Sequence, residues 1–297
     1  MVVGVSNIMN LTSPSQVKSW CIENDFHPNK VLGQNFLIDR NALVSIVDAG
    51  LAGADAGSAE VLEIGPGLGV LTEEMLSRGC SVTAVEKDPV LAGRLAQALG
   101  NPQRLSVIAG DALDLVSAKP SSSASPIHHS PFIIHNSSFI IHNFTHMISN
   151  LPYQAGTRIL LELVQTRAIP SMTVLVQTEV AERLAAKEGS KTRGLAGVWA
   201  QLDYDVKIVR KVAPSCFWPR PEVGSSVVTL TRHDRNVALS ARERVVFRRL
   251  TKKAFEHRRK QLGTIFRDLI QSQLRAEQLA NQEWINLAKG IAENEDS

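Results

Sequence analysis

Residues 61–69 read VLEIGPGLG, a short apolar run that ends in a glycine-rich turn. The run has the length and composition of a buried strand, and the residues after the turn have the spacing of a helix. Glycines at such a turn let a ligand approach the backbone closely, and the following helix presents unpaired backbone N–H groups to it. The segment therefore predicts a strand, a ligand-binding turn and a helix in succession.

Further apolar runs follow along the chain and alternate with helical segments, which is the pattern of a parallel sheet built from βαβ units. The sequence thus predicts an α/β fold. The last two runs are close enough in sequence to form an antiparallel hairpin at one edge of the sheet. The expected strands are 61–64, 81–86, 105–108, 147–149, 173–177, 206–212 and 226–231.

Helices are expected before and after the sheet region. Ser13 and Pro14 begin a short lead-in helix, and Asp39 caps a second helix that follows the string GQNFL at residues 33–37. After a linker at 232–238, Ser240 caps a basic helix, and the chain has a helical pattern to its end. We expect a sheet domain over residues 1–232 and a small helical domain over residues 239–297.

The 297-residue chain has the composition of an ordinary globular protein, with 44% hydrophobic and 21% charged residues. Its three cysteines, Cys21, Cys80 and Cys216, show no C-x-x-C spacing, which argues against a disulfide framework or a zinc–thiolate site. No segment approaches the ~18 to 20 consecutive apolar residues that span a bilayer, and the N-terminus lacks the basic region of a signal peptide. We expect a cytoplasmic protein without a membrane partner.

Positive charge is concentrated in one region. Residues 242–260 contain nine Lys and Arg against two Glu, whereas the whole chain carries a net charge of only +3. The remainder is therefore mildly acidic. A basic helical segment joined to an acidic body is typical of a protein whose one part binds phosphates. The alternative is a solvated helix face with no ligand.

Residues 117–145 interrupt the alternation of strands and helices. They are rich in serine and contain the near-repeat FIIHNSS followed by FIIHN. Five of the eight histidines lie in or beside this segment, which could suggest a metal site. Because the histidines repeat together with the rest of a short unit, a duplicated low-complexity insertion is the simpler interpretation. We expect a surface loop and no metal.

Two carboxylates follow the second and third expected strands. Glu86 ends the strand 81–86, where it can accept hydrogen bonds from both hydroxyls of a ribose, and Asp111 comes directly after the next strand. Both would lie at the carboxyl edge of the sheet, where ligands bind in such folds. The alternative is that they only cap helices. The glycine spacing, G-x-G-x-G, departs from the G-x-G-x-x-G of nicotinamide dinucleotide sites and disfavours an oxidoreductase.

The fourth strand ends in Asn150-Leu151-Pro152-Tyr153. An exocyclic amine on a nucleobase is a poor nucleophile because its lone pair is delocalised into the ring. It can nevertheless react if acceptors hold its hydrogens and aim the lone pair at an electrophile. The Asn150 side-chain oxygen and a backbone carbonyl before Pro152 are such acceptors. Tyr153 offers a face on which the base can stack, worth roughly 1–3 kcal/mol.

In order along the chain, these motifs resemble the KsgA-type family of small-subunit ribosomal RNA adenine dimethyltransferases. The resemblance covers residues 11–288 apart from the insert. It implies a class I, Rossmann-like methyltransferase fold that uses S-adenosylmethionine, followed by a helical RNA-binding domain. The strings that carry it are GQNFL (33–37), EIGPG (63–67), Glu86, GDA (110–112), NLPY (150–153), FWPRP (217–221) and FEHRRKQL (255–262).

The resemblance also implies a role for each matching residue. Asn35 and Leu37 would close the cofactor pocket, Gly65 would pack against the methionine part of the cofactor, and Glu86 would hold its ribose. Asp111, with Ala112, would recognise its adenine.

For the transfer itself, the resemblance places Asn150 between the cofactor and the target amine, with Leu151 and Tyr153 completing the catalytic group. Phe217 or Trp218 would form the opposite wall of the base pocket, or would pack in a core or hinge. The RNA-binding residues would be Arg248, Arg249, Lys252, Arg258, Arg259, Lys260 and Phe217.

The implied reaction is dimethylation of the N6 amine of two adjacent adenosines. These lie in the loop of the 3′-terminal hairpin of 16S small-subunit rRNA. The implied partner is that RNA within the immature small subunit, during ribosome biogenesis. We expect the chain to act as a monomer. The chain departs from the family pattern after Pro221, where Glu222 and Gly224 replace a basic or polar residue and an aspartate. Two further alternatives are a large-subunit methylase of the macrolide-resistance type and an assembly factor without catalysis.

Overall fold

The computed structural model describes residues 10–29, 32–116, 141–267 and 269–294. The chain divides into two compact units. The sheet unit comprises Met1–Thr178 and Val209–Thr229, and the helical unit comprises Glu179–Ile208 and Leu230–Ser297. The predicted division between 232 and 239 differs from this one, because it assigns residues 179–208 to the sheet domain. The expected insert at 117–145 lies, up to residue 140, outside the described residues.

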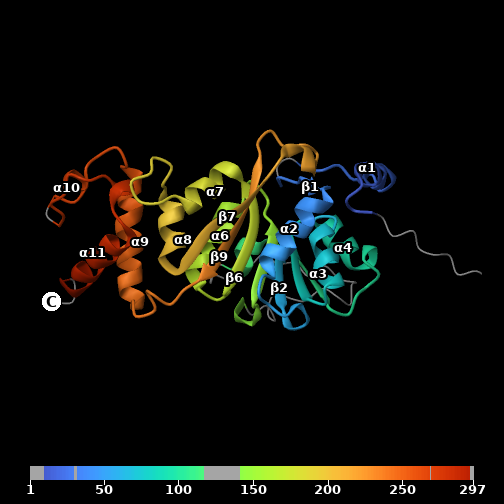
Figure 1. The fold of residues 1–297 in the computed structure, drawn as a ribbon, viewed down its shortest axis with the longest axis horizontal. Helices are drawn as coiled ribbons and strands as arrows, with labels where there is room; N and C mark the ends of the chain where they lie inside the picture. The colour runs from blue at the N-terminus through green and yellow to red at the C-terminus, as the bar shows by residue number, and fades with distance from the viewer. Residues whose placement is uncertain (1–9, 30–31, 117–140, 268, 295–297) are drawn as a thin grey trace, which may run out of the picture. The chain divides into compact units, whose positions relative to one another are not determined.

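One sheet contains seven strands of the described residues (Figure 1). They are β2 (Glu60–Ile64), β3 (Ser81–Glu86), β4 (Leu105–Ala109), β5 (His146–Asn150), β6 (Ser171–Gln177), β7 (Tyr204–Val212) and β9 (Ser225–Arg232). Their order is β4-β3-β2-β5-β6-β9-β7, so the last two expected strands are neighbours at one edge, as predicted. The pairs β2–β3, β3–β4, β2–β5 and β5–β6 are parallel, which confirms the α/β fold.

The strand order reverses at β2. The chain first moves outward from β2 to β3 and β4, and then returns to place β5 on the other side of β2. In open parallel sheets, a crevice forms outside the carboxyl ends of the strands at such a switch point. The residues that follow β2 and those that end β3 and β5 therefore surround one crevice.

Two helices of the sheet unit begin at aspartate caps, of which the sequence analysis predicted Asp39. Asp39 accepts a hydrogen bond from the Ala42 N–H (2.7 Å) at the start of α2 (Arg40–Gly50). Asp88 does the same for Val90 (2.9 Å) at the start of α4 (Pro89–Ala98). The described residues of this unit also form α1 (Pro14–Glu23), α3 (Val70–Ser77), α5 (Ala112–Val116) and α6 (Gly156–Thr166).

Two short strands that are far apart in sequence form a separate antiparallel pair. They are β1 (Phe36–Leu37) and β8 (Phe217–Trp218), with Phe36 opposite Trp218 and Leu37 opposite Phe217. The rings of Phe36 and Trp218 stack with their centroids 6.5 Å apart. This pairing joins the GQNFL and FWPRP strings, which the sequence does not show to be in contact.

The helical unit has an apolar core of its own. Its described helices include α8 (Leu195–Asp203), α9 (Ala241–Glu256), α10 (Leu262–Ile265) and α11 (Asn281–Asn294). Leu202 of α8 belongs to the same buried cluster as Phe247 of α9 and Trp284 of α11. This shared core explains why residues 179–208 group with the C-terminal helices, contrary to the predicted division.

Helix α9 begins at the predicted cap. The Ser240 side chain accepts the Glu243 N–H, and the Glu243 carboxylate accepts the Ser240 N–H, so both form a capping box. The short helix α7 (Thr178–Ala185) follows β6 directly. None of the helices in the described ranges is long and apolar enough to cross a membrane.

Candidate active site

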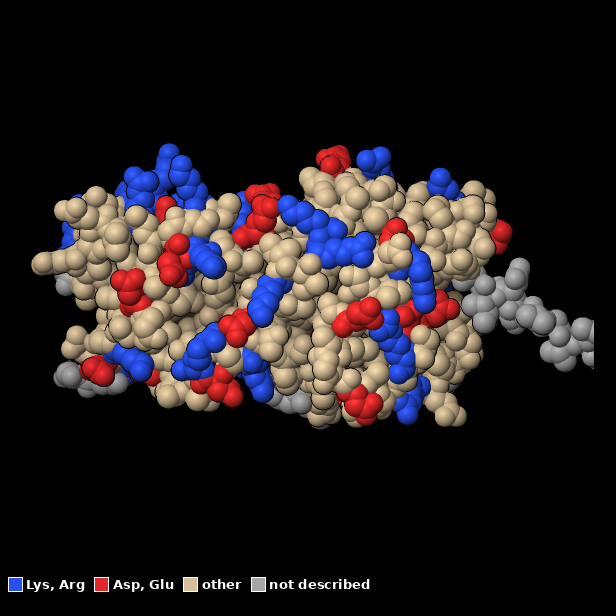
Figure 2. Space-filling view, viewed as in Figure 1, with Lys and Arg blue, Asp and Glu red and all other residues tan. Residues whose placement is uncertain are grey.

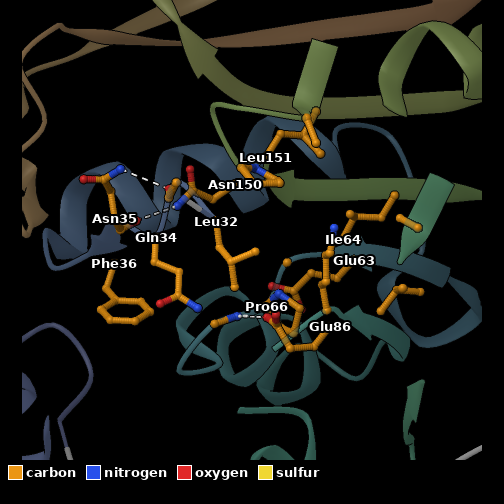
Figure 3. Close-up of a pocket in the computed structure, with 18 of the residues that line it drawn as sticks. Leu32, Gln34, Asn35, Phe36, Glu63, Ile64, Pro66, Glu86, Asn150 and Leu151 are labelled. Carbon is orange, nitrogen blue, oxygen red and sulfur yellow. Dashed lines mark hydrogen bonds between the residues drawn. The ribbon is translucent and has the colours of Figure 1, made fainter. Parts of the chain in front are cut away.

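A cavity of about 230 Å³ lies at the carboxyl edge of the parallel strands (Figure 3). The turn after β2, the ends of β3 and β5, the loop after β4 and the segment 32–37 all contribute to its lining. Eight residues predicted as catalytic or cofactor-binding line this one cavity. They are Asn35, Leu37, Gly65, Glu86, Asp111, Asn150, Leu151 and Tyr153.

The glycine-rich turn brings bare backbone to the cavity. Gly65 and Gly67 have φ values of +69° and +59°, a region that L side chains rarely adopt. A Cβ on Gly67 would also lie 3.1 Å from the ring of Phe36. The turn therefore needs glycine at position 67 both for its conformation and for the close approach of β1.

Glu86 ends β3 and is nearly buried, with 6% of its surface exposed. Its Oε2 accepts the Gly67 N–H at 3.1 Å, and its Oε1 accepts the Asp88 N–H at 2.8 Å (Figure 3 shows the first bond). Burial raises the pKa of this carboxyl above its ordinary value, although the two backbone hydrogen bonds act in the opposite direction. Glu86 is fixed in place with spare lone pairs that can accept hydroxyl hydrogens.

Asp111 both caps a helix and lines the cavity. Its Oδ1 accepts the Leu113 N–H (2.9 Å) at the start of α5, and its Oδ2 accepts a hydrogen bond from Lys87 Nζ (2.8 Å). Partial burial acts to raise the pKa of Asp111, but the hydrogen bonds from Lys87 and Leu113 outweigh it and lower the pKa below its ordinary value. Capping and ligand binding, which the sequence presents as alternatives, are thus compatible at this residue.

Asn150, the last residue of β5, is oriented by the segment on the opposite side of the cavity. Its Nδ2 donates to the backbone oxygen of Asn35 at 3.2 Å (Figure 3). Among the described residues, no donor is bonded to Asn150 Oδ1 or to the carbonyl oxygen of Leu151. The two acceptors that the sequence predicts for an amine are therefore both available.

Glu63 is a cavity residue to which the sequence analysis gave no role. It lies at the end of β2 with 1% of its surface exposed and accepts a hydrogen bond from Thr72 Oγ1 at 2.6 Å. Burial raises its pKa to about 8, against an ordinary 4.5; the Thr72 bond lowers it and nearby Glu86 raises it further. At neutral pH Glu63 is therefore mainly protonated, and the inner wall of the cavity carries no charge there.

Gln34 and Lys87 also line the cavity and were not predicted as site residues. Gln34 Nε2 donates to Asp88 Oδ2 at 3.0 Å, which ties the segment 32–37 to the start of α4. Both residues stand beside residues that the motifs single out, Asn35 and Glu86. The sequence could have indicated Gln34 and Lys87 because each is the direct neighbour of a predicted site residue.

The structure corrects the prediction for Phe217. Its side chain is 2% exposed and belongs to the main apolar core, where it pairs with Leu37. A buried ring cannot offer its face to RNA, so the alternative of core packing holds for Phe217. The prediction failed because the pairing of β1 with β8 cannot be read from either string alone.

The other predicted RNA-binding residues lie on α9 and in the turn that follows it. Lys and Arg gather where α9 ends, at the upper left of Figure 2. Lys252, Arg259 and Lys260 are exposed, and Arg258 donates to the backbone oxygen of Lys191 at 2.9 Å. The remaining two predicted residues, Arg248 and Arg249, lie within α9 itself.

Not all of the basic residues of α9 are on the surface. Arg244 forms two bonds with the Asp203 carboxylate, at 2.7 and 3.1 Å, and a third with the backbone oxygen of Asn236. The Asp203 side chain is only 4% exposed, so this is a largely buried ion pair. Arg244 therefore stabilises the helical unit, and the charge run contains fewer residues for a ligand than its count suggests.

The sequence matches a protein family described as "Ribosomal RNA adenine dimethylase" over residues 25–294. It is 42% identical over 220 residues to "Ribosomal RNA small subunit methyltransferase A" of Deinococcus radiodurans, covering 74% of this chain and 67% of that protein. The protein of the same name from Alkaliphilus oremlandii is 35% identical over 254 residues, covering 85% and 82% of the two chains.

The fold is similar to that of solved methyltransferase structures. A dimethyladenosine transferase from Plasmodium falciparum superposes with a TM-score of 0.68 at 20% identity, covering 87% of this chain and 98% of that one. The 23S rRNA methyltransferase ErmE gives a TM-score of 0.59 at 21% identity, with coverage of 86% and 98%. At these identities the likeness confirms the predicted class I, Rossmann-like methyltransferase fold.

Proposed function

This chain belongs to the ribosomal RNA adenine dimethylase family, and from that premise we propose a specific reaction and target for it. It is an rRNA adenine dimethyltransferase that uses S-adenosylmethionine. We propose that it dimethylates the N6 amines of two adjacent adenosines in the loop of the 3′-terminal hairpin of 16S rRNA. The observation that carries the amine as methyl acceptor is the pair of open acceptors, Asn150 Oδ1 and Leu151 O, on the cavity wall. The small-subunit target is supported by the names of the relatives.

The residues of the cavity fit S-adenosylmethionine. The turn at Gly65 and Gly67 presents backbone without side chains, which leaves room for the methionine part. The Glu86 carboxylate, an acceptor held by two backbone N–H groups, suits the ribose hydroxyls. Asp111 suits the amine of the adenine. Asn35 and Leu37 line the cavity from the segment 32–37, which would cover the cofactor. When bound, this cofactor supplies the methyl group.

The chain's own contribution to the transfer is orientation. The carbonyl of Asn35 holds Nδ2 of Asn150, and this bond directs the other end of the amide, Oδ1, to act as an acceptor. Together with Leu151 O it would take both hydrogens of the target amine and aim the nitrogen lone pair at the methyl carbon. An amine placed in this way would need no strong base before the N–C bond replaces the S–C bond of the sulfonium, and its proton would pass to solvent afterwards.

Tyr153 would receive the target base after it leaves its stack. Its half-buried ring lines the cavity next to the two acceptors. Unstacking costs a few kcal/mol and costs less in a loop than in a duplex, which suits a hairpin-loop target. With Phe217 buried and Trp218 stacked on Phe36 outside the cavity lining, the second aromatic ring among the described residues that line the cavity is Phe36.

RNA affinity would come from the exposed basic residues at the end of α9. Phosphate contacts by Lys252, Arg259 and Lys260 would give binding that weakens steeply with salt. We propose that the chain acts as a monomer on the immature small subunit, in the cytoplasm. The relatives at 35–42% identity are small-subunit methyltransferases by name, which favours this target over the large-subunit one.

Labelled S-adenosylmethionine and undermethylated small subunits provide the test. The chain should transfer four methyl groups per subunit, and the label should map to two adjacent adenosines of the 3′-terminal hairpin. Label on large-subunit RNA would favour the macrolide-resistance type of activity. Binding to subunits without any transfer would favour an assembly factor that has lost catalysis.

A further inference from the structure

Tyr153 is held at both of its ends. At one end, the Tyr153 backbone packs against Gly33: a Cβ added to Gly33 would lie only 3.1 Å from the Tyr153 nitrogen. At the other end, the Tyr153 hydroxyl is 2.6 Å from Ser225 Oγ. Tyr153 lines the cavity, whereas Ser225 is fully buried at the start of β9. The ring thus joins the loop after β5 to the sheet.

The position of Ser225 is fixed by the residues on either side of it. The Thr178 N–H donates to the backbone oxygen of Gly224 at 2.9 Å, and Thr178 Oγ1 shares a hydrogen bond with Ser226 Oγ at 3.1 Å. Thr178 directly follows β6, so these bonds attach the start of β9 to its neighbour in the sheet. The Ser225 hydroxyl is therefore a rigid anchor for Tyr153.

The anchor is present although Glu222 and Gly224 depart from the family pattern, and the Gly224 oxygen itself accepts the Thr178 N–H. A buried hydroxyl needs a hydrogen-bond partner, because leaving it unsatisfied is costly. Within the described ranges, the partner of Ser225 Oγ is the Tyr153 hydroxyl. The bond also explains why a tyrosine suits this position better than a phenylalanine: stacking requires only the ring face, whereas the hydroxyl allows the sheet to set the direction of that face.

We propose that Ser225 is a positioning residue for methyl transfer. It fixes the Tyr153 ring in advance, so that the target adenine stacks in the one orientation in which its amine meets Asn150 Oδ1 and Leu151 O. This inference rests on the proposed function, in which Tyr153 receives the base. Fixing a contact surface before binding removes the cost of ordering it when the substrate arrives.

Three single variants and one double variant test the proposal. They are Ser225→Ala, Tyr153→Phe, both together, and Ser226→Ala as the matched control. Ser226 is as buried as Ser225, but its hydroxyl bonds Thr178 and not Tyr153, and in Ser226→Ala the backbone bond from the Thr178 N–H to the Gly224 oxygen still holds the start of β9 in place. Ser225→Ala and Tyr153→Phe should each lower kcat on undermethylated small subunits about fivefold, the worth of one neutral hydrogen bond. The double variant should lose no more than either single one, and S-adenosylmethionine affinity should not change.

A spectroscopic readout is independent of RNA. The chain has two tyrosines, so labelling with 13Cζ-tyrosine gives two NMR signals, and Tyr153→Phe identifies one of them. Ser225→Ala should shift the Tyr153 signal, and Ser226→Ala should leave it in place.

An unmoved Tyr153 signal in Ser225→Ala would overturn the proposal. So would multiplicative losses of kcat in the double variant, equal losses in Ser225→Ala and Ser226→Ala, or full activity of Ser225→Ala. If the unaltered chain does not methylate adenine, the proposed function fails and this role fails with it. If the chain is active and the variants behave otherwise than expected, the positioning role alone fails.

Discussion

The cavity of the sheet unit and the basic helix of the helical unit hold their polar side chains in opposite ways. At the cavity, the protein holds key side chains in place and leaves acceptor capacity for a ligand: Asn150 is bonded through Nδ2 while Oδ1 stays open, and the Glu86 carboxylate keeps spare lone pairs. On α9 and after it, several cations are used within their own unit: Arg244 pairs with Asp203, and Lys253 lies over the ring of Phe266. A sequence motif whose residues line a cavity therefore predicts the role of each residue. A run of charged residues predicts only that the segment as a whole can bind phosphates, and not which of its members do so.

The largest effect is expected at the cavity. Asn150→Ala should lower methyl transfer to undermethylated small subunits by about 10²- to 10³-fold, since it removes a fixed acceptor that acts in the transition state. Tritium transfer from labelled S-adenosylmethionine measures the rate, and RNA binding serves as the control because it should not change. A rate near that of the unaltered chain would remove Asn150 from the mechanism.

The next effect separates structural cations from binding cations on α9. Arg244→Met should lower the free energy of unfolding by about 3 kcal/mol, because it leaves the buried Asp203 carboxylate without its partner. Chemical denaturation measures this change. Lys252→Met, on the exposed face of the same helix, is the control and should change stability little. Equal stability of the two variants would show that the ion pair is not the structural element described above.

A pH-dependent effect is expected from Glu63. Its pKa is raised to about 8 in the folded chain, so the stability it contributes is full below its ordinary 4.5 and is lost as the pH rises through about 8. Over that interval the free energy of unfolding should fall by up to about 1.4 kcal/mol per pH unit. Glu63→Gln should flatten the profile between pH 6 and 8, whereas Glu60→Gln, at the exposed start of the same strand, should not. An unchanged slope in Glu63→Gln would contradict the protonated state.

The smallest effect per residue is expected from the exposed cations. Replacing Lys252, Arg259 and Lys260 with alanine should make RNA binding less sensitive to salt. The plot of log affinity against log salt concentration should become less steep by about 2, at ~0.7 per phosphate contact for single strands. Filter binding across a salt series measures this slope. The affinity for S-adenosylmethionine should stay the same, because the cavity lies within the sheet unit. Loss of both affinities together would indicate misfolding instead.

The sequence predicted the features that depend on local pattern. The strand 81–86, the Asp39 cap and the Ser240 cap are where they were expected, because period and capping chemistry act over a few residues. Glu86, Asp111 and Asn150 line one cavity, as expected, because the carboxyl ends of parallel strands meet at one edge of the sheet. Asn35 and Leu37 were assigned to this cavity by the family resemblance alone.

The features that the sequence did not predict depend on pairing across long separations. Phe217 was expected at an RNA surface, and only its pairing with Leu37 shows that it is buried. The bond between Tyr153 and Ser225 and the ion pair of Arg244 join segments with no common motif. Burial of Glu63 likewise depends on the elements packed around β2, so its raised pKa could not be inferred from its place in the glycine-rich string.

The antiparallel pair β1–β8 has a consequence for how the enzyme is made. Residues 36–37 leave the ribosome early, but their partner strand at 217–218 is synthesised much later. Until then the segment 32–37, which forms one wall of the cavity, lacks the strand that fixes it. A nascent or truncated chain that stops before residue 217 would therefore contain every residue that lines the cofactor pocket but lack the strand that pairs with one of its walls, and competence to modify ribosomes would be acquired only late in translation.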